Sequence, residues 1–202
     1  MKYPDLSVAY QLLKKYQLSN TIGAYKVGGS NLRSADFFDY DDVLLGAISA
    51  DNIFHSAIPK NYPVAELEII AKIRVTNSQI GSYLIESYHW GIECPFISVE
   101  NKHGDPWICI CDNCSAGDLL IYEEISLNSI NSVKLISGEE VKAIGNIGNL
   151  IYSVEAIVAK SIDIIRDHNL PLEEGFLYIA SGGITDVFQL HENENLRIVI
   201  EK

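Results

Sequence analysis

The sequence lacks any run of about 18 consecutive apolar residues, the length that a membrane-spanning helix needs. Its first residues, MKYPDLSVAY, have no uninterrupted apolar stretch behind a basic start and so do not resemble a secretory signal. Low-complexity tracts are absent too. The chain has 202 residues, of which 48% are apolar, enough to bury a sizeable core. We therefore expect a cytoplasmic protein with a single domain over residues 1–202 and a short helical segment at 1–20.

Positive charge is scarce. Fifteen lysines and arginines stand against 27 acidic residues, and the formal net charge is -12. This excess repels the phosphate backbone of nucleic acids and removes the electrostatic attraction of an anionic membrane, so we expect neither as a partner. An acidic substrate is not excluded, because a bound cation or local lysines can reverse the field inside one pocket.

Cysteine is limited to four clustered residues, Cys94, Cys109, Cys111 and Cys114. The last three form a C-x-C-x-x-C pattern, which can indicate a zinc site. The paired C-x-x-C knuckles of structural zinc sites are missing, however. Buried, reduced thiols are therefore the favoured interpretation, and structural zinc is the alternative.

The most regular stretch of the chain is PVAELEIIAKIRV, residues Pro63 to Val75. Every second side chain from Ala65 onward is apolar, whereas the opposite face carries Glu66 and Glu68, which predicts a half-buried β-strand. At about 3.3 Å of rise per residue, the two glutamates stand roughly 6.6 Å apart at Cα and point the same way. Both carboxylates can then converge on one cation, although a solvated edge strand is the simpler alternative.

The remaining sequence predicts several strands and few helices. Apolar spacing predicts helices over 5–18 and 79–88, and a third after Gly148 with Asn149 as N-cap. A loop or short helical turn is expected over 33–42. Alternation and turn residues predict strands over 21–27, 94–100, 107–113, 118–123, 132–136, 176–181 and 196–200. Without regular βαβ alternation, this favours the α+β class, as a mixed β roll or sandwich with flanking helices.

Four segments, in order and spacing, resemble the 2-keto-4-pentenoate hydratase branch of the fumarylacetoacetate hydrolase superfamily. AYKVGGSN (24–31) is similar to the family's G-x-K-hydrophobic-G turn, and PVAELEII is similar to its E-x-E strand. DNCSAG (112–117) resembles its D-N-x-S-x-G motif, and LPLEEGFLYIASGGIT (170–185) its L-x-x-G-D-hydrophobic strand that ends in G-x-x-T. The resemblance implies a fumarylacetoacetate hydrolase-like fold.

The resemblance also implies a Mg²⁺ or Mn²⁺ ion that chelates a 2-oxo acid. Its ligands are Glu66, Glu68 and a third glutamate one strand later, whose motif position falls on Ser98. Serine is a neutral, weak ligand, so Glu100 or Glu93 would have to compensate. The family's following arginine is replaced by Asn101-Lys102. Because the chain is shorter than the usual family member, parts of the pocket wall are expected to be either missing or supplied by a partner subunit, and we expect a homo-oligomer.

For the chemistry, we predict that Lys26 and Asp112 are the catalytic residues. A partly desolvated lysine near a cation has a lowered pKa and can exchange protons near neutral pH, whereas the alternative for Lys26 is a surface lysine at a turn. Asp112 either orients Lys26 or caps a turn. The residues expected to bind substrate are Gly28, Ser30, Asn113, Ser115 and Thr185.

Three functions remain open from the sequence. The favoured one is a metal-dependent lyase or hydrolase that hydrates, decarboxylates or cleaves a 2-oxo acid through a metal-stabilised enolate. The second is a diverged, weakly active or inactive relative that binds a small carboxylic acid, which the serine at position 98 would support. The third is a structural zinc protein.

Overall fold

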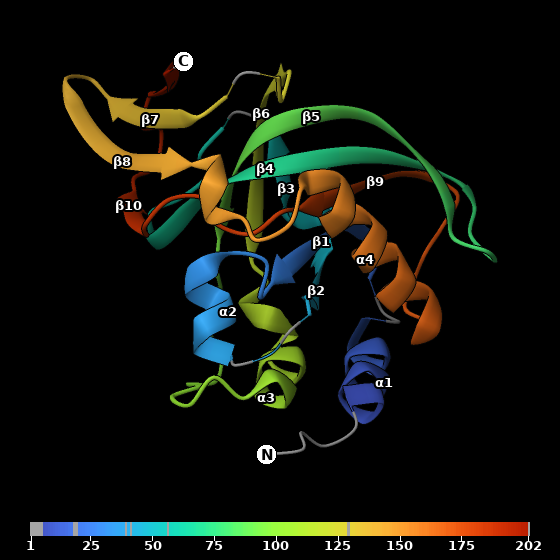
Figure 1. Ribbon diagram of the computed structural model, residues 1–202. Helices are drawn as coiled ribbons and strands as arrows, with labels where there is room; N and C mark the ends of the chain where they lie inside the picture. The colour runs from blue at the N-terminus through green and yellow to red at the C-terminus, as the bar shows by residue number, and fades with distance from the viewer. Residues whose placement is uncertain are drawn as a thin grey trace.

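The computed structural model describes residues 6–17, 20–38, 40, 42–55, 57–128 and 130–201, with only the backbone at 16–17 (Figure 1). The helices are α1 Leu6–Gln17, α2 Leu32–Phe38, α3 Pro106–Cys111 and α4 Val154–Asp167, with 3₁₀ turns η1 Ala50–Asn52, η2 Asn113–Ser115 and η3 Ile147–Asn149. The strands are β1 Ile22–Gly28, β2 Leu44–Ser49, β3 Ile53–His55, β4 Tyr62–Asn77, β5 Ser82–Cys94, β6 Asp118–Ile125, β7 Ser132–Ser137, β8 Glu140–Asn146, β9 Gly175–Ala180, β10 Phe188–Leu190 and β11 Leu196–Glu201.

Most strands belong to one curled, mixed sheet of order β2-β1-β9-β4-β5-β6-β3, to which β10 adds by pairing with β4. Within it, β9 lies parallel to β1 and antiparallel to β4. A smaller antiparallel sheet, β11-β7-β8, projects to one side of it (Figure 1). The predicted α+β class, a mixed β roll with flanking helices, is confirmed.

Strand β4 confirms the strand predicted over 63–75 and extends it to 16 residues. From Ala65 to Val75 every second side chain is at most 2% exposed and belongs to the main core. Full burial of each larger member, such as Leu67 or Ile69, contributes about 1.5–3 kcal/mol. Because alternate side chains point to opposite faces, this buried row fixes which way the glutamates of β4 point.

A second, smaller apolar cluster occupies the opposite face of the large sheet. Its members come from β1, β2, β4, β6 and β9, and they are Ala24, Ile48, Ile70, Leu119, Ile121 and Ala180. Ile70 lies two residues from Glu68 and therefore on the same face of β4. The apolar cluster consequently borders the acidic side chains of that strand and surrounds them with a medium of low polarity.

Helices cover the sheet and close its ends. Helix α4 packs against β1, β2 and β4, while α1 packs against α3. The predicted helix over 5–18 is confirmed as α1, although positions 5 and 18 lie outside the described residues. Helix α4 starts later than predicted. Its N-cap is Ser153, whose hydroxyl accepts from the Ala156 amide, whereas Asn149 lies in the η3 turn before it.

Several predicted elements are wrong. Residues 79–88 do not form a helix, because Ser82 onward is strand β5, which pairs antiparallel with β4 through register pairs such as Ile73↔Ile85. The predicted strand over 94–100 stops at Cys94. Residues 107–113 form helix α3 and a turn, because Asp105 caps the helix through the Trp107 amide and Pro106 presets its first turn. Local periodicity was overridden in each case by pairing or capping.

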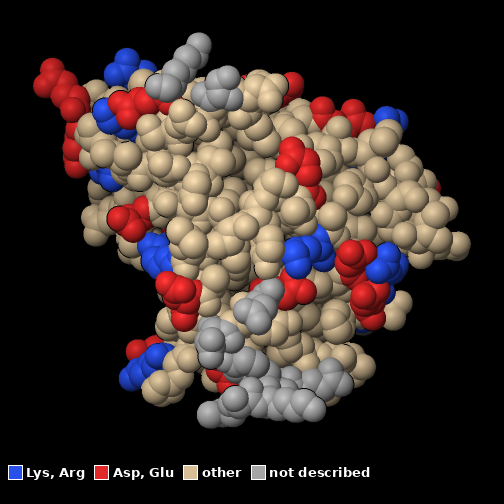
Figure 2. Space-filling model, viewed as in Figure 1, with Lys and Arg blue, Asp and Glu red and all other residues tan. Residues whose placement is uncertain are grey.

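On the face that Figure 2 shows, lysines and arginines are interspersed with acidic side chains. The net charge of -12 is therefore not offset there by a basic patch. Among the described residues, no helix is long and apolar enough to span a bilayer.

Candidate functional site

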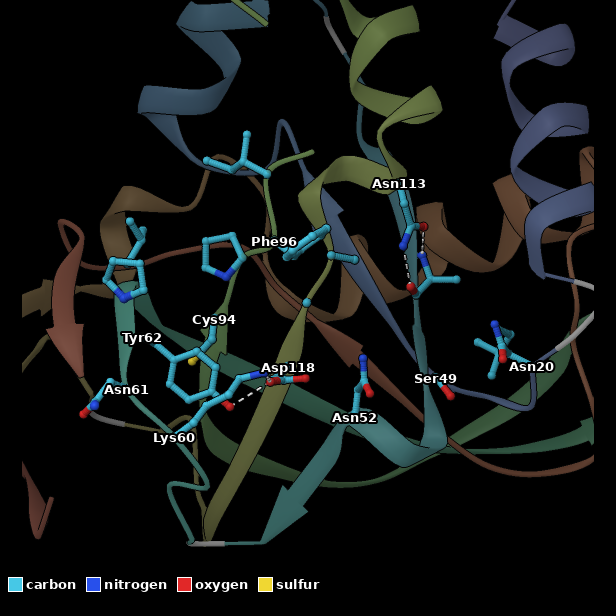
Figure 3. A pocket seen from close by; sticks show the side chains of 18 residues that line it. Asn20, Ser49, Asn52, Lys60, Asn61, Tyr62, Cys94, Phe96, Asn113 and Asp118 are labelled. Atoms are coloured by element: carbon cyan, nitrogen blue, oxygen red, sulfur yellow. Dashed lines mark hydrogen bonds and ion pairs between the residues drawn. The ribbon is translucent and has the colours of Figure 1, made fainter. Parts of the chain in front are cut away.

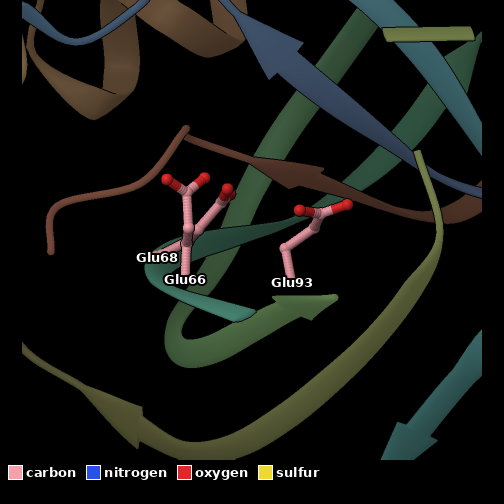
Figure 4. Close-up of side chains that lie close together, drawn as sticks. All are labelled: Glu66, Glu68 and Glu93. Carbon is pink, nitrogen blue, oxygen red and sulfur yellow. The ribbon is translucent and has the colours of Figure 1, made fainter. Parts of the chain in front are cut away.

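Three glutamates gather on one face of the β4–β5 pair (Figure 4). Glu66 and Glu68 come from β4 and Glu93 comes from β5, and one carboxylate oxygen of each lies within 4.8 Å of the others. The strand register explains this, because Glu66 lies opposite Glu93 while Glu68 lies opposite Gly91. An added Cβ at Gly91 would lie 2.2 Å from the Ile70 side chain, so the glycine keeps this face open. The structure thus brings Glu66 and Glu68 together, as the alternation predicts.

The three carboxylates differ in burial and in partners. The side chain of Glu93 is fully buried, and it accepts hydrogen bonds from Lys26 Nζ at 2.8 Å and from the Gly117 amide at 3.4 Å. Glu66 is 13% exposed and forms an ion pair with Arg33. Fully buried Glu68 accepts one hydrogen bond, 3.0 Å from the Gly182 amide to Oε2. Its Oε1 is buried and has no hydrogen-bond partner among the residues that the structure describes.

Burial and mutual repulsion favour the protonated forms of the inner carboxylates. Burial, together with the charge of Glu93, raises the pKa of Glu68 to about 8. Burial also raises the pKa of Glu93, although the Lys26 ammonium opposes this effect. Three carboxylates in a poorly solvated space therefore carry an electrostatic cost that a cation would relieve.

We predict that the ion-free protein loses stability as the pH rises from about 5 to 8. Between 4.5 and about 8 the folded protein holds a proton on Glu68 that the unfolded chain releases, so folding weakens as that proton is lost. Glu93 acts in the same direction. Thermal unfolding in a chelator should show the midpoint falling by roughly 5–10 °C over this range. Glu68→Gln should flatten the profile, and an unchanged slope in this variant would contradict the assignment.

Lys26 provides the buried positive charge of the site. It lies on β1, with its side chain 11% exposed, and donates to Glu93 Oε2. Burial alone would lower the pKa of Lys26, but the charges of Glu93, Glu68 and Glu66 outweigh burial and raise it. The sequence predicts a lowered pKa for Lys26, but in the ion-free protein the carboxylates raise it. Lys26 is accordingly a positively charged ammonium held beside three acids and not a surface lysine at a turn.

The donor set fits a divalent cation. Carboxylate oxygens are the hard ligands that Mg²⁺ and Mn²⁺ prefer. The unpartnered Oε1 of Glu68 is an unsatisfied acceptor of the kind that proteins rarely bury without purpose. The backbone at Gly183 lies close against the Glu66 carboxylate. A Cβ added at this glycine would lie 2.8 Å from the Glu66 carboxyl carbon, so a larger residue would not fit. Glu66, Glu68 and Glu93 are therefore the residues that could hold such an ion.

Three predicted substrate-binding residues lie near the glutamates: Gly28 and Ser30 at the end of β1, and Thr185 in the segment after β9. Ser30 donates to the Ser181 carbonyl, and Thr185 accepts from the Leu67 amide at 3.1 Å. Gly28 ends β1, and an added Cβ there would make only ordinary contacts. These side chains fix the backbone around the glutamates, and their role in binding substrate stays a prediction.

The DNCSAG motif forms a strained turn next to the site. Asn113, Cys114 and Ser115 all have positive φ, between 50° and 54°. Asp112 accepts hydrogen bonds from Ser98 and Ser115 and not from Lys26 among the described side chains, while Asn113 binds both backbone groups of Ala47. The motif thereby ties the 112–117 segment to β2 and presents the Gly117 amide to Glu93.

The two other predicted metal ligands lie outside the glutamate cluster. Ser98 hydrogen bonds with Asp112, and Glu100 is 75% exposed and pairs with Lys102 at 3.3 Å. The carboxylate that joins Glu66 and Glu68 is Glu93, on the strand that follows theirs. The motif alignment to CPFISVEN placed the third ligand on Ser98, with Glu100 or Glu93 as the acids that could compensate. Of these two, the structure brings Glu93 to the cluster and leaves Glu100 outside it.

The cysteines do not form a ligand cluster. Cys94, Cys109 and Cys114 are buried and Cys111 is exposed, and all four are free thiols. Burial raises the pKa of Cys94 and Cys114, which keeps them protonated. Among the side chains that the structure describes, the three glutamates are the only group of three or more acids, histidines or cysteines close enough to hold one ion. This disfavours structural zinc.

Figure 3 shows a cavity of about 700 Å³ whose lining includes Cys94, Asn113 and Asp118. It touches the site through Gly117 but is lined by none of the three glutamates and not by Lys26. Inside it, Asp118 accepts from Tyr62 at 2.7 Å and pairs with Lys60 at 2.8 Å. We place the chemistry at the glutamates and not in this larger space, because the unpaired buried oxygen lies with them.

No protein-family model and no curated protein matches the chain. Solved structures do match it. A 4-oxalocrotonate decarboxylase from Pseudomonas putida G7, complexed with magnesium and adipate, has a TM-score of 0.72 at 16% identity, covering 96% of this chain and 81% of that chain. The same enzyme with calcium and acetate has a TM-score of 0.70 at 16% identity, covering 96% and 81%.

A third match is to a Yersinia pestis CO92 protein named for the fumarylacetoacetate hydrolase family, with a TM-score of 0.57 at 15% identity, covering 89% of this chain and 88% of that chain. At such low identities, the likeness establishes the fold alone. The chain has the fumarylacetoacetate hydrolase-like fold, and the resemblance seen in its four motifs is confirmed at this level.

Proposed function

We propose that the protein is a metal-dependent enzyme, a lyase or hydrolase that acts on a 2-oxo acid. The observation that carries this proposal is the buried cluster of Glu66, Glu68 and Glu93, in which one carboxylate oxygen has no partner. The shared fold adds support, because the similar decarboxylase structures were obtained with magnesium or calcium and a carboxylic acid. Hydration, decarboxylation and C–C cleavage all fit this site.

In this proposal the three glutamates hold Mg²⁺ or Mn²⁺. When bound, such an ion supplies Lewis acidity, which polarises the carbonyl of a chelated 2-oxo acid. The low-polarity cluster around Ile70 limits the water that reaches the glutamates and strengthens electrostatic interactions there.

In this proposal Lys26 transfers the proton. A divalent ion on the glutamates would offset the carboxylate charges that raise the pKa of Lys26 in the ion-free protein, and so make its proton easier to release. Its Nζ carries a proton that it shares with Glu93 Oε2 at 2.8 Å, and it is the basic group most deeply buried in the site. In this role Nζ donates a proton to the reacting carbon or leaving group of the acid and accepts one in the reverse direction. Asp112 serves as a positioning residue, through the turn that presents the Gly117 amide to Glu93.

The alternative of an inactive acid-binding relative loses its main support. That alternative rested on the neutral serine at position 98, but the structure supplies a third carboxylate from Glu93. No other observation on the described residues favours it.

Metal removal tests the proposal directly. We expect the purified protein to turn over members of a panel of 2-oxo acids, including oxaloacetate and 2-oxopent-4-enoate, in the presence of Mg²⁺ or Mn²⁺. Excess EDTA should abolish the activity and added Mn²⁺ should restore it, with product formation followed by ultraviolet absorbance and mass spectrometry. Activity that survives complete metal removal, or failure of Mn²⁺ to bind by calorimetry, would overturn the proposal.

A further inference from the structure

Arg33 lies at the outer edge of the glutamate cluster. It forms an ion pair with Glu66, the most exposed of the three carboxylates. We propose that Arg33 binds the carboxylate of the acid substrate, and that it exchanges Glu66 for this carboxylate once a divalent ion occupies the glutamates. This inference rests on the proposed function and assigns the residue that recognises the negative charge of the substrate.

The backbone near Arg33 is fixed to the site. Asn31, which is 6% exposed, donates from Nδ2 to the Gly183 carbonyl at 2.9 Å and accepts from the Ser34 amide at 2.8 Å. It therefore caps the start of α2 and ties it to the segment whose Gly182 amide binds Glu68. Arg33, in the first turn of α2, is held at the edge of the glutamates by this anchor.

The present contacts of Arg33 leave it free to change partners. Its side chain is 53% exposed, and its second ion pair, at 3.5 Å, joins it to Asp186, which is 99% exposed. Such exposed pairs stabilise a protein little. Lys26, by contrast, is 11% exposed and held at 2.8 Å by fully buried Glu93. The guanidinium can therefore turn from Glu66 to an incoming anion at small cost, whereas the buried ammonium cannot.

Charge balance favours this exchange. The three glutamates with Lys26 and Arg33 have a formal charge of -1, and a divalent ion changes it to +1. Glu66 then has a stronger partner than Arg33, and the local field attracts an anion despite the net charge of -12. The site attracts an anionic acid only after the divalent ion has bound to the glutamates. The ion should therefore bind first and the acid second.

The chemistry of arginine suits the task. A guanidinium presents parallel N–H donors that match both oxygens of a carboxylate. Among the basic side chains that the structure describes, Lys26 and Arg33 are those that form ion pairs with the three glutamates. Lys102 is 65% exposed and pairs with Glu100 instead. Arg33 is therefore the partly exposed cation placed to meet a carboxylate at the edge of the cluster.

Oxalate and Mn²⁺ are suitable probes. Wild type, Arg33→Gln and Arg33→Lys would be titrated calorimetrically with Mn²⁺ alone, and then with oxalate at saturating Mn²⁺. Arg74→Gln is the matched control, because Arg74 lies on β4, is 50% exposed and pairs with Glu86, so it loses the same charge at similar exposure. Circular dichroism and thermal unfolding would verify that each variant is folded.

In Arg33→Gln we expect Mn²⁺ affinity to stay level or rise, because the guanidinium no longer competes for Glu66. Oxalate affinity should fall about 10- to 100-fold, as for loss of a charged hydrogen bond. Arg33→Lys should fall in between, and Arg74→Gln should match wild type. Equal oxalate affinities in wild type and Arg33→Gln, or an equal loss in Arg74→Gln, would overturn the proposal while leaving the metal site intact. If wild type binds no Mn²⁺, the proposed function fails, and this inference fails with it.

Discussion

Glu68→Gln is expected to abolish tight binding of Mg²⁺ and Mn²⁺. Glu68 is a fully buried acid of the cluster, and its Oε1 is the buried oxygen that has no partner among the described residues. An amide keeps the shape of the side chain but removes the charge that a hard cation requires. We expect the affinity to fall at least about 100-fold, because even loss of a group that only hydrogen bonds to a metal ligand typically lowers metal affinity about 10- to 100-fold. Calorimetric titration with Mn²⁺ measures this directly.

The matched control is Glu100→Gln. It removes the same charge from a side chain that is 75% exposed and paired with Lys102, so its Mn²⁺ affinity should equal that of wild type. Glu68→Gln should remain folded, because burial of the charged carboxylate opposes folding and the amide does not. Equal Mn²⁺ affinity in Glu68→Gln and wild type would show that the cluster is not a ligand set.

Lys26→Met is expected to have two large effects. Because Glu93 is fully buried and Lys26 is its cationic partner, the variant leaves a buried charge uncompensated and should lose about 3–5 kcal/mol of unfolding free energy. Turnover should fall at least about 100-fold through loss of proton transfer. Chemical denaturation in EDTA gives the first quantity, and the Mn²⁺-dependent assay of 2-oxo acids gives the second.

A double variant separates the two effects. Lys26→Met with Glu93→Gln removes both charges of the pair, so most of the lost stability should return. Activity should not return, because neither the proton donor nor the third carboxylate is present. Turnover near the wild-type level in a folded Lys26→Met variant would exclude Lys26 as the proton-transfer group.

The sequence predicted those parts of the site that depend on local pattern. Alternation along β4 placed Glu66 and Glu68 on one face. The apolar side chains of the opposite face, such as Leu67, are buried together and fix the orientation of the whole strand. The glycines after Lys26 marked the end of β1 correctly. Both inferences needed only the period of a strand and the turn chemistry of glycine.

The parts that failed depend on contacts between segments distant in sequence. Residues 79–88 have apolar residues at spacings that suit a helix, and only pairing with β4 makes them a strand. Glu93 is recognisable as the third acid once this register is known. Arg33 meets Glu66 across 33 positions. No local signal in the 33–42 stretch, which we expected to be a loop or a short helical turn, indicates that contact.

The position of β9 in the large sheet determines when the site can form during synthesis. Lys26 is on β1 and the E-x-E glutamates are on β4, but these strands are joined through β9, which begins only at Gly175. A ribosome must therefore translate most of the chain before the lysine and the acids can be held at their final separation. Until then, strand edges that β9 later covers are exposed to other chains. The arrangement of the lysine and the glutamates is thus a late product of folding, and the nascent protein depends on β9 to protect the edges of β1 and β4.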